Sequence, residues 1–371
     1  MGEPTPAPND HPRPLDELRQ KIDDVDASIV RLLNQRARLV VEVGQVKRQN
    51  NARFYAPSRE SEVFRRACER SDGPLPDRAI RAIYREIMSA SLALEEAIRV
   101  AYLGPLGTFT HMAARAKFGD SVEYIPTRDI LGIFRAVASR AADVGVVPVE
   151  NSIDGGVADT LDAFMSFDVQ ICSELLMEVH HCLMAPRRDT GVHKIYSKPQ
   201  VFAQCGRWLG EHYPDADLMS VSSTARACEV AREEENAAAI AHSSAAAMYG
   251  LEILHHNIED VASNVTRFVV LGQESCKPSD HDKTSLVLSV VHKAGALYAA
   301  LEPFRDNGLN LTRIESRPSK RNPWEYYFFI DFEGHRDDEA VQQTLQKVQE
   351  VCNYLQILGS YSVAQHTVTI D

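Results

Sequence analysis

RVAYLG, residues 99–104, is the stretch at which the periodicity of this sequence changes. Before it, apolar residues recur every three or four positions, which is typical of helices. After it, short apolar runs such as SVEYIP (121–126) and DVGVVPV (143–149) alternate with helical stretches. That alternation is typical of an open, largely parallel α/β sheet. The fold is therefore predicted to change from all-helical to α/β at this point.

On the N-terminal side, residues 14–98 are predicted to form three helices. The first begins at Leu15, keeps an apolar heptad spacing and continues for about 35 residues, or ~50 Å. Two shorter helices are expected, one from 57 to 70 and one from 77 to 98. They cannot cover the whole apolar face of the first helix, so we expect a second copy of the chain to complete it.

On the C-terminal side, the α/β part is predicted to extend over residues 99–275. The polar stretch ESCKPSDHD (274–282) indicates a linker. Residues 283–366 follow a β-α-β-β-α-β order, which is the ferredoxin-like α+β motif. Residues 1–13 contain no apolar segment and are predicted to form a disordered tail and not a signal peptide.

The composition of the 371-residue chain excludes several function classes. A formal net charge of −12 disfavours nucleic-acid binding, which needs a basic face. The apolar runs fall far short of the ~20 residues of a membrane span. Seven cysteines without a CxxC pair indicate reduced thiols in a cytoplasmic protein. His180-His181-Cys182 is expected in a strand, where neighbours face opposite sides, so neither a metal site nor a cofactor is predicted.

Motifs of one known enzyme family follow one another along the chain: LRQKID (18–23), NQRARLVVEVGQVK (34–47), PSRE (57–60), SASLALEE (89–96), LGPLGTFTH (103–111), VVPVENS (146–152), YSKPQVFAQC (196–205), NVTRFVVL (264–271), GALYAAL (295–301) and RIESRP (313–318). In these motifs the sequence resembles the bifunctional P-protein family, the chorismate mutase–prephenate dehydratases with a C-terminal ACT domain. The resemblance implies an all-α mutase domain, a two-lobed α/β dehydratase domain and a ferredoxin-like ACT domain. It also implies conversion of chorismate to prephenate and then to phenylpyruvate, with feedback inhibition by phenylalanine.

The mutase reaction needs no nucleophile, because chorismate rearranges by itself. An enzyme accelerates the reaction by holding the compact conformer and stabilising the charge that develops at the ether oxygen. The resemblance implies four cations, a hydroxyl-binding carboxylate with an assisting serine, and a group facing the ether oxygen. These are, in that order, Arg19, Arg36, Lys47 and Arg59; Glu60 with Ser91; and Glu95.

The helix spacing supports part of this assignment. Arg36 and Lys47 are eleven residues apart, about three turns, so they share one face of the helix. Arg36 also occupies a position of the apolar seam, where an unpaired cation is costly. Arg19 lies roughly 25 Å from Arg36 along the same axis, so we expect it to reach the site of the other subunit in a dimer or larger homo-oligomer.

Two positions depart from some members of the family. Ala56 stands where some relatives have an acid, which leaves one substrate contact in doubt. Glu95 stands where some have glutamine, and a carboxylate cannot donate a hydrogen bond whereas a carboxylic acid can. The hypothesis that follows is that Glu95 works in its protonated form, so that mutase activity falls as the pH rises.

The dehydratase reaction removes CO₂ and a ring hydroxyl from prephenate. A donor must reach the hydroxyl, while the departing carboxylate should not be held too firmly by cations. The resemblance places Thr266 at the catalytic position, Arg267 on the side-chain carboxylate and Phe268 beneath the site. It lines the pocket with six further residues: Glu150, Asn151, Ser197, Gln204, Ser223 and Thr224.

Several alternatives stay open for this site. The proton can come from Thr266 or from a buried Glu150. Ser223 and Thr224 can be a helix N-cap without a ligand, and Gln204 can lie on an exposed helix face. The role of Lys198, which replaces a histidine of many relatives, and the choice between prephenate and arogenate are not decided by the sequence.

For the C-terminal domain, the resemblance implies a phenylalanine site at a dimer interface. Its residues would be Gly295, Ala296, Leu297, Asn310, Leu311, Glu315, Ser316, Arg317 and Pro318. The alternatives are a dimerisation domain without ligand and, for the whole chain, a non-catalytic amino-acid sensor, because fold alone proves no chemistry. Whether the assembly is a dimer or a tetramer is not decided either.

Overall fold

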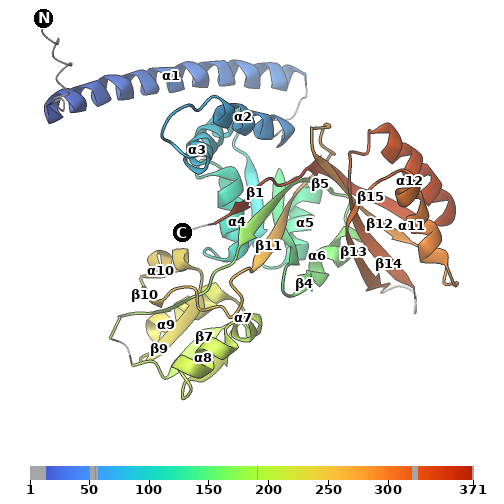
Figure 1. Ribbon diagram of the computed structural model, residues 1–371. Coiled ribbons are helices and arrows are strands. Elements are labelled where there is room, and N and C mark those ends of the chain that lie inside the picture. The colour runs from blue at the N-terminus through green and yellow to red at the C-terminus, as the bar shows by residue number, and fades with distance from the viewer. Residues whose placement is uncertain (1–13, 51–54, 56, 190, 320–324, 370–371) are drawn as a thin grey trace, which may run out of the picture.

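The computed structural model describes residues 14–50, 55, 57–189, 191–319 and 325–369, so the predicted tail at 1–13 lies outside the described residues. Figure 1 shows three parts: helices near the N-terminus, a central α/β domain of two lobes, and a C-terminal sheet with two helices. This confirms the predicted combination of all-α, α/β and ferredoxin-like α+β domains.

The helical part consists of α1 (Leu15–Gln49), α2 (Pro57–Glu69) and α3 (Asp77–Glu95). Both α1 and α2 pack against α3, while most of α1 extends beyond them (Figure 1). The apolar seam predicted for α1 is therefore exposed in the single chain, at Leu15, Leu18, Ile22, Val25, Ile29, Leu32, Leu39, Val43 and Val46.

The first lobe of the central domain contains a seven-stranded sheet in the order β16-β5-β11-β3-β1-β2, with β4 paired to β3. Its strands are β1 (Arg99–Leu103), β2 (Glu123–Thr127), β3 (Val144–Asn151), β4 (Gly155–Gly156), β5 (Gln170–Glu178), β11 (Val265–Gly272) and β16 (Thr367–Val368). Its helices are α4 (Phe109–Phe118), α5 (Ile130–Ala138) and α6 (Ala158–Phe164). The sheet is mixed and not largely parallel, because β11 returns from the second lobe and enters antiparallel between β3 and β5.

The second lobe contains a five-stranded sheet in the order β10-β6-β9-β7-β8. Its strands are β6 (Cys182–Ala185), β7 (Lys194–Ser197), β8 (Asp217–Ser220), β9 (Ala237–Ala241) and β10 (Glu252–His255). Its helices are α7 (Pro199–Gln204), α8 (Gly206–His212), α9 (Thr224–Glu233) and α10 (Ser243–Tyr249). The chain passes between the lobes twice, after β5 and before β11, and these two crossings bring polar residues to the line where the lobes meet.

The C-terminal domain has an antiparallel sheet in the order β13-β14-β12-β15. Its elements are β12 (Asp282–Ser289), α11 (Ala296–Asp306), β13 (Leu311–Pro318), β14 (Tyr326–Glu333), α12 (Glu339–Val351) and β15 (Tyr354–Ser362). One face of the sheet packs on the two helices through residues such as Leu288 and Phe332. Val287 and Phe329, on the other face, belong to the core of the first lobe. The chain then returns to that lobe, where β16 pairs with β5.

Two further observations concern membrane-spanning helices and metal sites. Among the described helices, none combines the length and the apolar character needed to cross a bilayer. His180 and His181 lie between β5 and β6 and not in a strand, contrary to the prediction, and Cys182 begins β6. Within the described ranges, no three His, Cys, Asp or Glu side chains are grouped closely enough to hold a metal ion.

Candidate active sites

A cluster of neutral polar side chains lies where the two lobes of the central domain meet. It consists of Asn151 at the end of β3, His181 after β5, Gln204 at the end of α7, and Asn264 and Thr266 at the start of β11. We call this group the Thr266 cluster. Thr266 and Asn151 face each other in the β11–β3 register, and both Asn264 and Thr266 are buried.

The orientation of the Asn151 amide is determined by the backbone. Its Oδ1 accepts hydrogen bonds from the N–H groups of Ile153 at 2.9 Å and Asp154 at 3.1 Å. The amide nitrogen therefore faces the other way, where it donates to Asn264 Oδ1 at 2.7 Å and to Thr266 Oγ1 at 2.8 Å. Because Thr266 accepts this bond, its own hydroxyl proton is left to donate, and no acceptor for it occurs among the described residues.

Gln204 joins the two lobes across the cluster. Its Nε2 donates to Asp154 Oδ2 at 3.0 Å, on the turn after β3, and its Oε1 accepts from Asn264 Nδ2 at 3.3 Å. The same Oε1 lies 2.8 Å from His181 Nε2. Burial lowers the pKa of His181, so its imidazole is neutral at pH 7 and donates through Nε2–H. The cluster thus contains hydroxyl, amide and neutral imidazole groups, with no cation among its five members.

Other residues expected in the dehydratase pocket are engaged elsewhere. The buried Ser197 hydroxyl donates to the backbone carbonyl of Ile240 at 2.8 Å. Ser223 Oγ accepts from the N–H of Arg226 at 3.0 Å and caps α9, while Thr224 is the buried first residue of that helix. The capping alternative therefore describes what Ser223 does in this structure.

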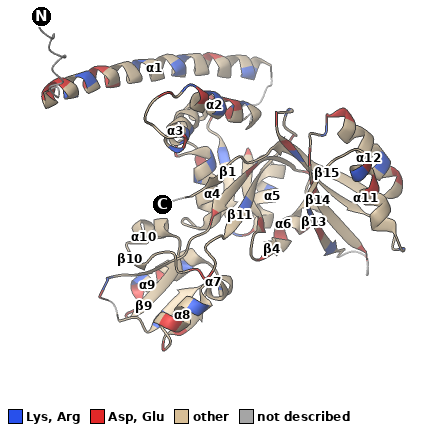
Figure 2. Ribbon diagram, viewed as in Figure 1, with Lys and Arg blue, Asp and Glu red and all other residues tan. Residues whose placement is uncertain are grey.

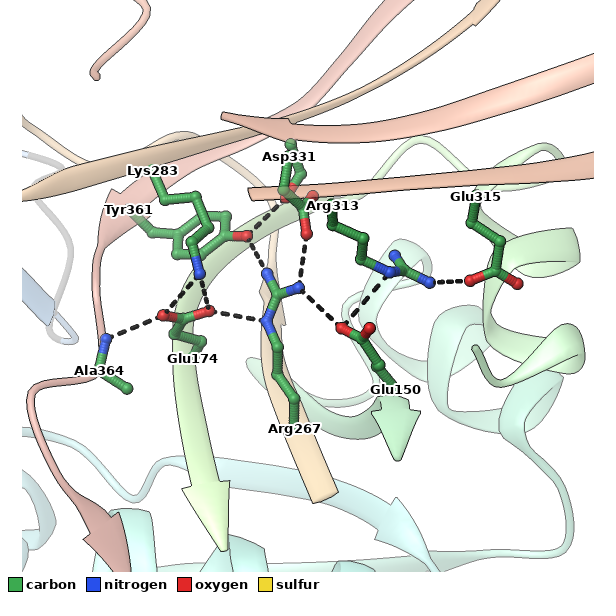
Figure 3. A network of polar contacts seen from close by, with 10 residues as sticks. Glu150, Glu174, Arg267, Lys283, Arg313, Glu315, Asp331, Tyr361 and Ala364 are labelled. Carbon is green, nitrogen blue, oxygen red and sulfur yellow. Dashed lines mark hydrogen bonds and ion pairs between the residues drawn. The ribbon is translucent and has the colours of Figure 1, made fainter. Parts of the chain in front are cut away.

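Arg267 points toward the C-terminal sheet (Figure 3). Its guanidinium donates to Glu174 at 2.8 Å, to Asp331 on β14 at 2.5 Å and to the Tyr361 hydroxyl on β15 at 2.7 Å. Burial alone would lower the pKa of Arg267, but these three neighbours raise it well above its usual value. Because successive residues of a strand face opposite sides, Arg267 lies on the other side of β11 from Thr266, and its expected role on the substrate carboxylate stays a prediction.

The expected role of Glu150 stays a prediction for the same reason. It precedes Asn151 on β3 and pairs with Arg267 in the register, so it lies on the same side as Arg267. Its Oε2 is 3.6 Å from Arg267 Nη1 and 3.4 Å from Arg313 Nε of the C-terminal domain (Figure 3). Phe268, the next residue of β11, is buried in a core cluster with Met177 and Val270.

A second group of polar residues joins α1 to α3 in the helical part. Arg36 donates to Ser91 Oγ, and Lys47 Nζ lies 2.6 Å from Glu95 Oε2. Ser91 and Glu95 are buried and stand one helical turn apart on α3. Four of the predicted mutase residues are thus brought together in pairs.

The remaining predicted mutase residues lie outside these pairs. Arg19 is exposed on the distal part of α1, 3.6 Å from Asp16, and does not reach the site of its own chain. Arg59 is exposed on α2 and binds Glu62. Glu60 is buried on the same helix, and Ala56 lies outside the described residues.

The residues expected to bind an effector are divided between two places. Ala296 and Leu297 line a hollow of about 170 Å³ at the start of α11, where Gly295 has a left-handed backbone with φ of 80°. On β13, however, Glu315 and Arg317 face the central domain, and Arg317 lies 3.3 Å from Asp162 of α6.

The other candidates of this group lie on or next to β13. Ser316 and Pro318 are exposed on the opposite side of the strand from Glu315 and Arg317. Asn310 donates to Glu333 at 3.2 Å, and Leu311 packs against the core of the C-terminal domain. These residues do not form one pocket within a single chain.

Three family models match the chain in the order of its domains. Chorismate mutase type II matches residues 18–96, prephenate dehydratase matches 100–276, and the ACT domain matches 284–350. A bifunctional chorismate mutase/prephenate dehydratase from Aquifex aeolicus is 46% identical over 355 residues, which cover 94% of this chain and 98% of the relative. The chain belongs to the bifunctional chorismate mutase/prephenate dehydratase family. The sequence-based identification is confirmed.

Two further matches agree with membership in this family. A bifunctional chorismate mutase/prephenate dehydratase from Pseudomonas aeruginosa is 43% identical, with coverage of 94% of this chain and 98% of the relative. The crystal structure of a prephenate dehydratase from Arthrobacter aurescens in complex with L-Phe is 33% identical, with a TM-score of 0.66, and covers 72% of this chain and 90% of that chain. The protein is therefore an enzyme with a mutase domain, a dehydratase domain and an ACT domain.

Sequence reasoning missed three site residues: His181 and Asn264, which belong to the Thr266 cluster, and Asp154, which contacts it. His181 was considered only as a metal ligand, although it lies between two apolar strands at a crossing between lobes. Asp154, which holds the Gln204 amide, belongs to no motif that drew attention to it. The available signal for His181 was a polar residue next to a buried strand. Asp154 is recognisable only from its hydrogen bond to Gln204 in the structure.

Proposed function

We propose that Arg36 and Lys47 form the cationic centre of the mutase site, with Ser91 and Glu95 as their supports on α3. The observation that carries this is the pair of contacts, Arg36 to Ser91 and Lys47 to Glu95, one helical turn apart. Two fixed cations suit a dicarboxylate whose ether oxygen gains negative charge in the transition state. Arg59 on α2 would add a third positive charge at the edge of this site.

The Lys47–Glu95 contact bears on the donor to the ether oxygen. Lys47 carries a positive charge and N–H donors, so it can itself donate to the ether oxygen, which an ionised Glu95 cannot do. Glu95 then positions Lys47 as an acceptor and needs no proton of its own. Glu95→Gln is therefore expected to leave the pH profile of mutase kcat/KM unchanged, whereas a profile that becomes flat would restore the hypothesis of a protonated Glu95.

A homodimer or larger assembly would complete the mutase site. Exposed apolar residues along α1 provide a surface for a second copy, and the exposed Arg19 would enter the partner's site. Arg19→Met and Arg36→Met, each inactive alone, should regain mutase activity when unfolded and refolded together, because a mixed dimer has one intact site. The absence of recovery in a mixture that does form dimers would mean that Arg19 acts within its own chain.

In the dehydratase site we propose that the Thr266 hydroxyl donates to the departing ring hydroxyl of prephenate. Support comes from the Asn151 bond, which occupies an acceptor position of Thr266 and leaves its proton free. Glu150 lies on the other face of the strands, which favours Thr266 over Glu150 as the donor. Asn264, Gln204 and His181 would keep the Asn151 amide in this orientation. Because the cluster contains no cation, the carboxylate of prephenate can leave as CO₂.

One assay tests both activities together. The pure protein is incubated separately with chorismate, prephenate and arogenate, and phenylpyruvate and phenylalanine are followed. Formation of prephenate and phenylpyruvate from chorismate, with no phenylalanine from arogenate, is expected. A preference for arogenate would change the substrate while leaving the assigned residues in place.

We further propose that phenylalanine binds the ACT domain and inhibits the dehydratase. The hollow beside Ala296 and Leu297 offers room for part of the ligand, and exposed Ser316 and Pro318 of a second copy would close it. Feedback requires two dehydratase states with different affinities for the effector. Isothermal titration calorimetry with phenylalanine should give saturable binding, and none at millimolar ligand would refute the proposal.

The domain limits proposed from the sequence are 14–98, 99–275 and 283–366, with a tail at 1–13. They are supported by the helix and strand bounds, although β16 returns to the dehydratase sheet just beyond residue 366. The seven cysteines of the described residues form no disulfide, which favours a reducing compartment, so we place the enzyme in the cytoplasm. Limited proteolysis should cut first between 274 and 282 if the linker is correctly placed.

A further inference from the structure

The mutase and dehydratase domains contact each other at Glu60. Lys117, on α4 of the dehydratase domain, places its Nζ 3.0 Å from Glu60 Oε2. The two side chains are only 14% and 10% exposed, so the contact is largely shielded from water. Tyr55, just before α2, donates its hydroxyl to the same Oε2 at 3.2 Å.

Lys117 is held in place by close packing on either side of it. Its neighbour Phe118 is buried in the dehydratase core, and the Phe118 ring lies 5.1 Å from that of Tyr55. At Gly119 a Cβ atom would come within 2.6 Å of the Ser89 Cβ of α3, so only glycine allows this approach. The Ser121 N–H donates to Ser89 Oγ at 3.0 Å. The end of α4 is thereby fixed against the mutase domain.

The contacts at Glu60 fall on one of its two oxygens. Lys117 and Tyr55 both approach Oε2, whereas no donor to Oε1 occurs within the described part of the chain. Burial and the Glu60 carboxylate together raise the pKa of Tyr55 well above its usual value, so its phenol keeps its proton and donates. A carboxylate anchored through one oxygen presents the other in a fixed direction, and the geometry leaves Oε1 for a ligand hydroxyl.

We propose that Lys117, although it belongs to the dehydratase domain, is a positioning residue of the mutase site. It fixes Glu60 through Oε2 so that Oε1 accepts the hydroxyl of chorismate in the reactive conformer. The inference rests on the role that the family resemblance implies for Glu60, the carboxylate that binds a substrate hydroxyl. Its consequence is that the mutase site extends over two domains of the chain, so that part of its organisation depends on how α4 docks against α2 and α3.

The test compares Lys117→Met, Lys117→Arg, Glu60→Gln and the double variant Lys117→Met/Glu60→Gln in the full-length protein. Lys117→Met should lower mutase kcat/KM on the order of tenfold, since a displaced positioning group costs up to about a hundredfold. Lys117→Arg should recover most of the loss. In the double variant, Lys117→Met should add no further loss of mutase kcat/KM to that of Glu60→Gln, because both changes disrupt the same Lys117–Glu60 contact.

Two controls accompany these measurements. Dehydratase kcat/KM should stay unchanged in every variant and reports folding of the same polypeptide; if Lys117→Met misfolds, Lys117→Gln takes its place. Arg115→Met removes a cation from the same helix that binds Asp120 and not Glu60, and it should leave mutase activity unchanged.

The outcomes separate the inference from the proposal on which it rests. A normal mutase in Glu60→Gln would refute the role of Glu60, and the inference with it. An impaired Glu60→Gln beside a normal Lys117→Met would overturn the inference alone. Losses that multiply in the double variant would also overturn it, because Lys117 would then act independently of Glu60.

Discussion

The two active sites proposed for this chain differ in charge. In the mutase site, Arg36 and Lys47 approach the buried Ser91 and Glu95, and Figure 2 shows further Lys and Arg positions, interspersed with Asp and Glu positions, along α1 and α2. In the dehydratase site, Thr266 is surrounded by amides and a neutral imidazole. The chemistry accounts for the contrast, because rearrangement of a dianion is stabilised by fixed cations, whereas a carboxylate that leaves as CO₂ is hindered by them.

The contrast depends on how strands position neighbouring residues. Thr266 and Arg267 are adjacent in sequence, yet Thr266 is bound by Asn151 where the lobes meet, whereas Arg267 is bound by Glu174, Asp331 and Tyr361. The guanidinium of Arg267 is thus neutralised by carboxylates where the central domain meets the ACT domain (Figure 3). The same strand therefore carries the proposed catalytic residue on one face and contacts the ACT domain with the other.

The largest expected effect is that of Thr266→Val, which removes the hydroxyl and keeps the shape. Loss of one pre-organised donor to a developing charge costs about 10²–10³-fold in kcat. Dehydratase kcat should fall by this amount while mutase kcat/KM, measured on the same preparation, stays constant. Thr266→Ser, which keeps a hydroxyl, should recover much of the activity. Equal losses in the Val and Ser variants would mean that the hydroxyl is not what matters.

Lys47→Met tests the cationic side of the comparison. It removes a donor aimed at the developing charge and leaves Glu95 buried without its partner. We expect mutase kcat to fall on the order of 10²-fold with dehydratase activity unchanged. Arg48→Met is the matched control, since Arg48 donates to the backbone carbonyl of Glu95 and Lys47 binds the Glu95 carboxylate. A comparable loss in both variants would point to helix packing and not to charge.

Asp331→Asn tests whether Arg267 is held by the ACT junction. Asp331 is buried, and its carboxylate is held ionised in part by Arg267, which lowers the pKa of Asp331 although burial itself raises it. Removing one partner of a buried ion pair costs about 3–5 kcal/mol. Denaturant unfolding followed by tryptophan and tyrosine fluorescence should show this loss. An unchanged midpoint would mean that the junction does not depend on the pair.

A smaller effect of pH is expected at His180, which lies at a crossing between the lobes. Burial lowers the pKa of His180, but hydrogen bonds to Glu259 and Glu178 raise it above its usual value overall. Protonated His180 therefore stabilises the fold below its unfolded pKa of about 6.5, and this contribution, less than about 1 kcal/mol, disappears as the pH rises through the folded pKa. The decrease in unfolding midpoint between pH 6 and pH 8 should be smaller in His180→Gln. An identical decrease in both proteins would contradict this.

Much of the domain organisation could be predicted from the sequence, since helical and strand periodicities are local properties. The long α1 with its exposed seam and the order of the ACT elements follow from such patterns. The pairing of β16 with β5 was missed, because two residues of β-structure carry no periodic signal and depend on a distant partner strand.

The dehydratase site was predicted less completely, for a physical reason. Motifs located Thr266 and Asn151, which bond to each other, and Gln204, which joins them through Asn264. The same motifs also drew Glu150 and Arg267 into the site, although alternation along β3 and β11 turns both toward the ACT domain. Which face of a strand points to the other lobe depends on how the lobes and the ACT sheet pack, and no local sequence pattern predicts it.

The central claim is that Thr266 donates because Asn151 occupies its acceptor side. Asn151→Asp tests this most directly, because a carboxylate of nearly the same shape would accept the Thr266 proton instead of donating to Thr266. We predict a fall in dehydratase kcat on the order of 10²-fold, although Thr266 itself is intact, with mutase kcat/KM unchanged. Dehydratase activity close to that of the unmodified protein in Asn151→Asp would contradict the account.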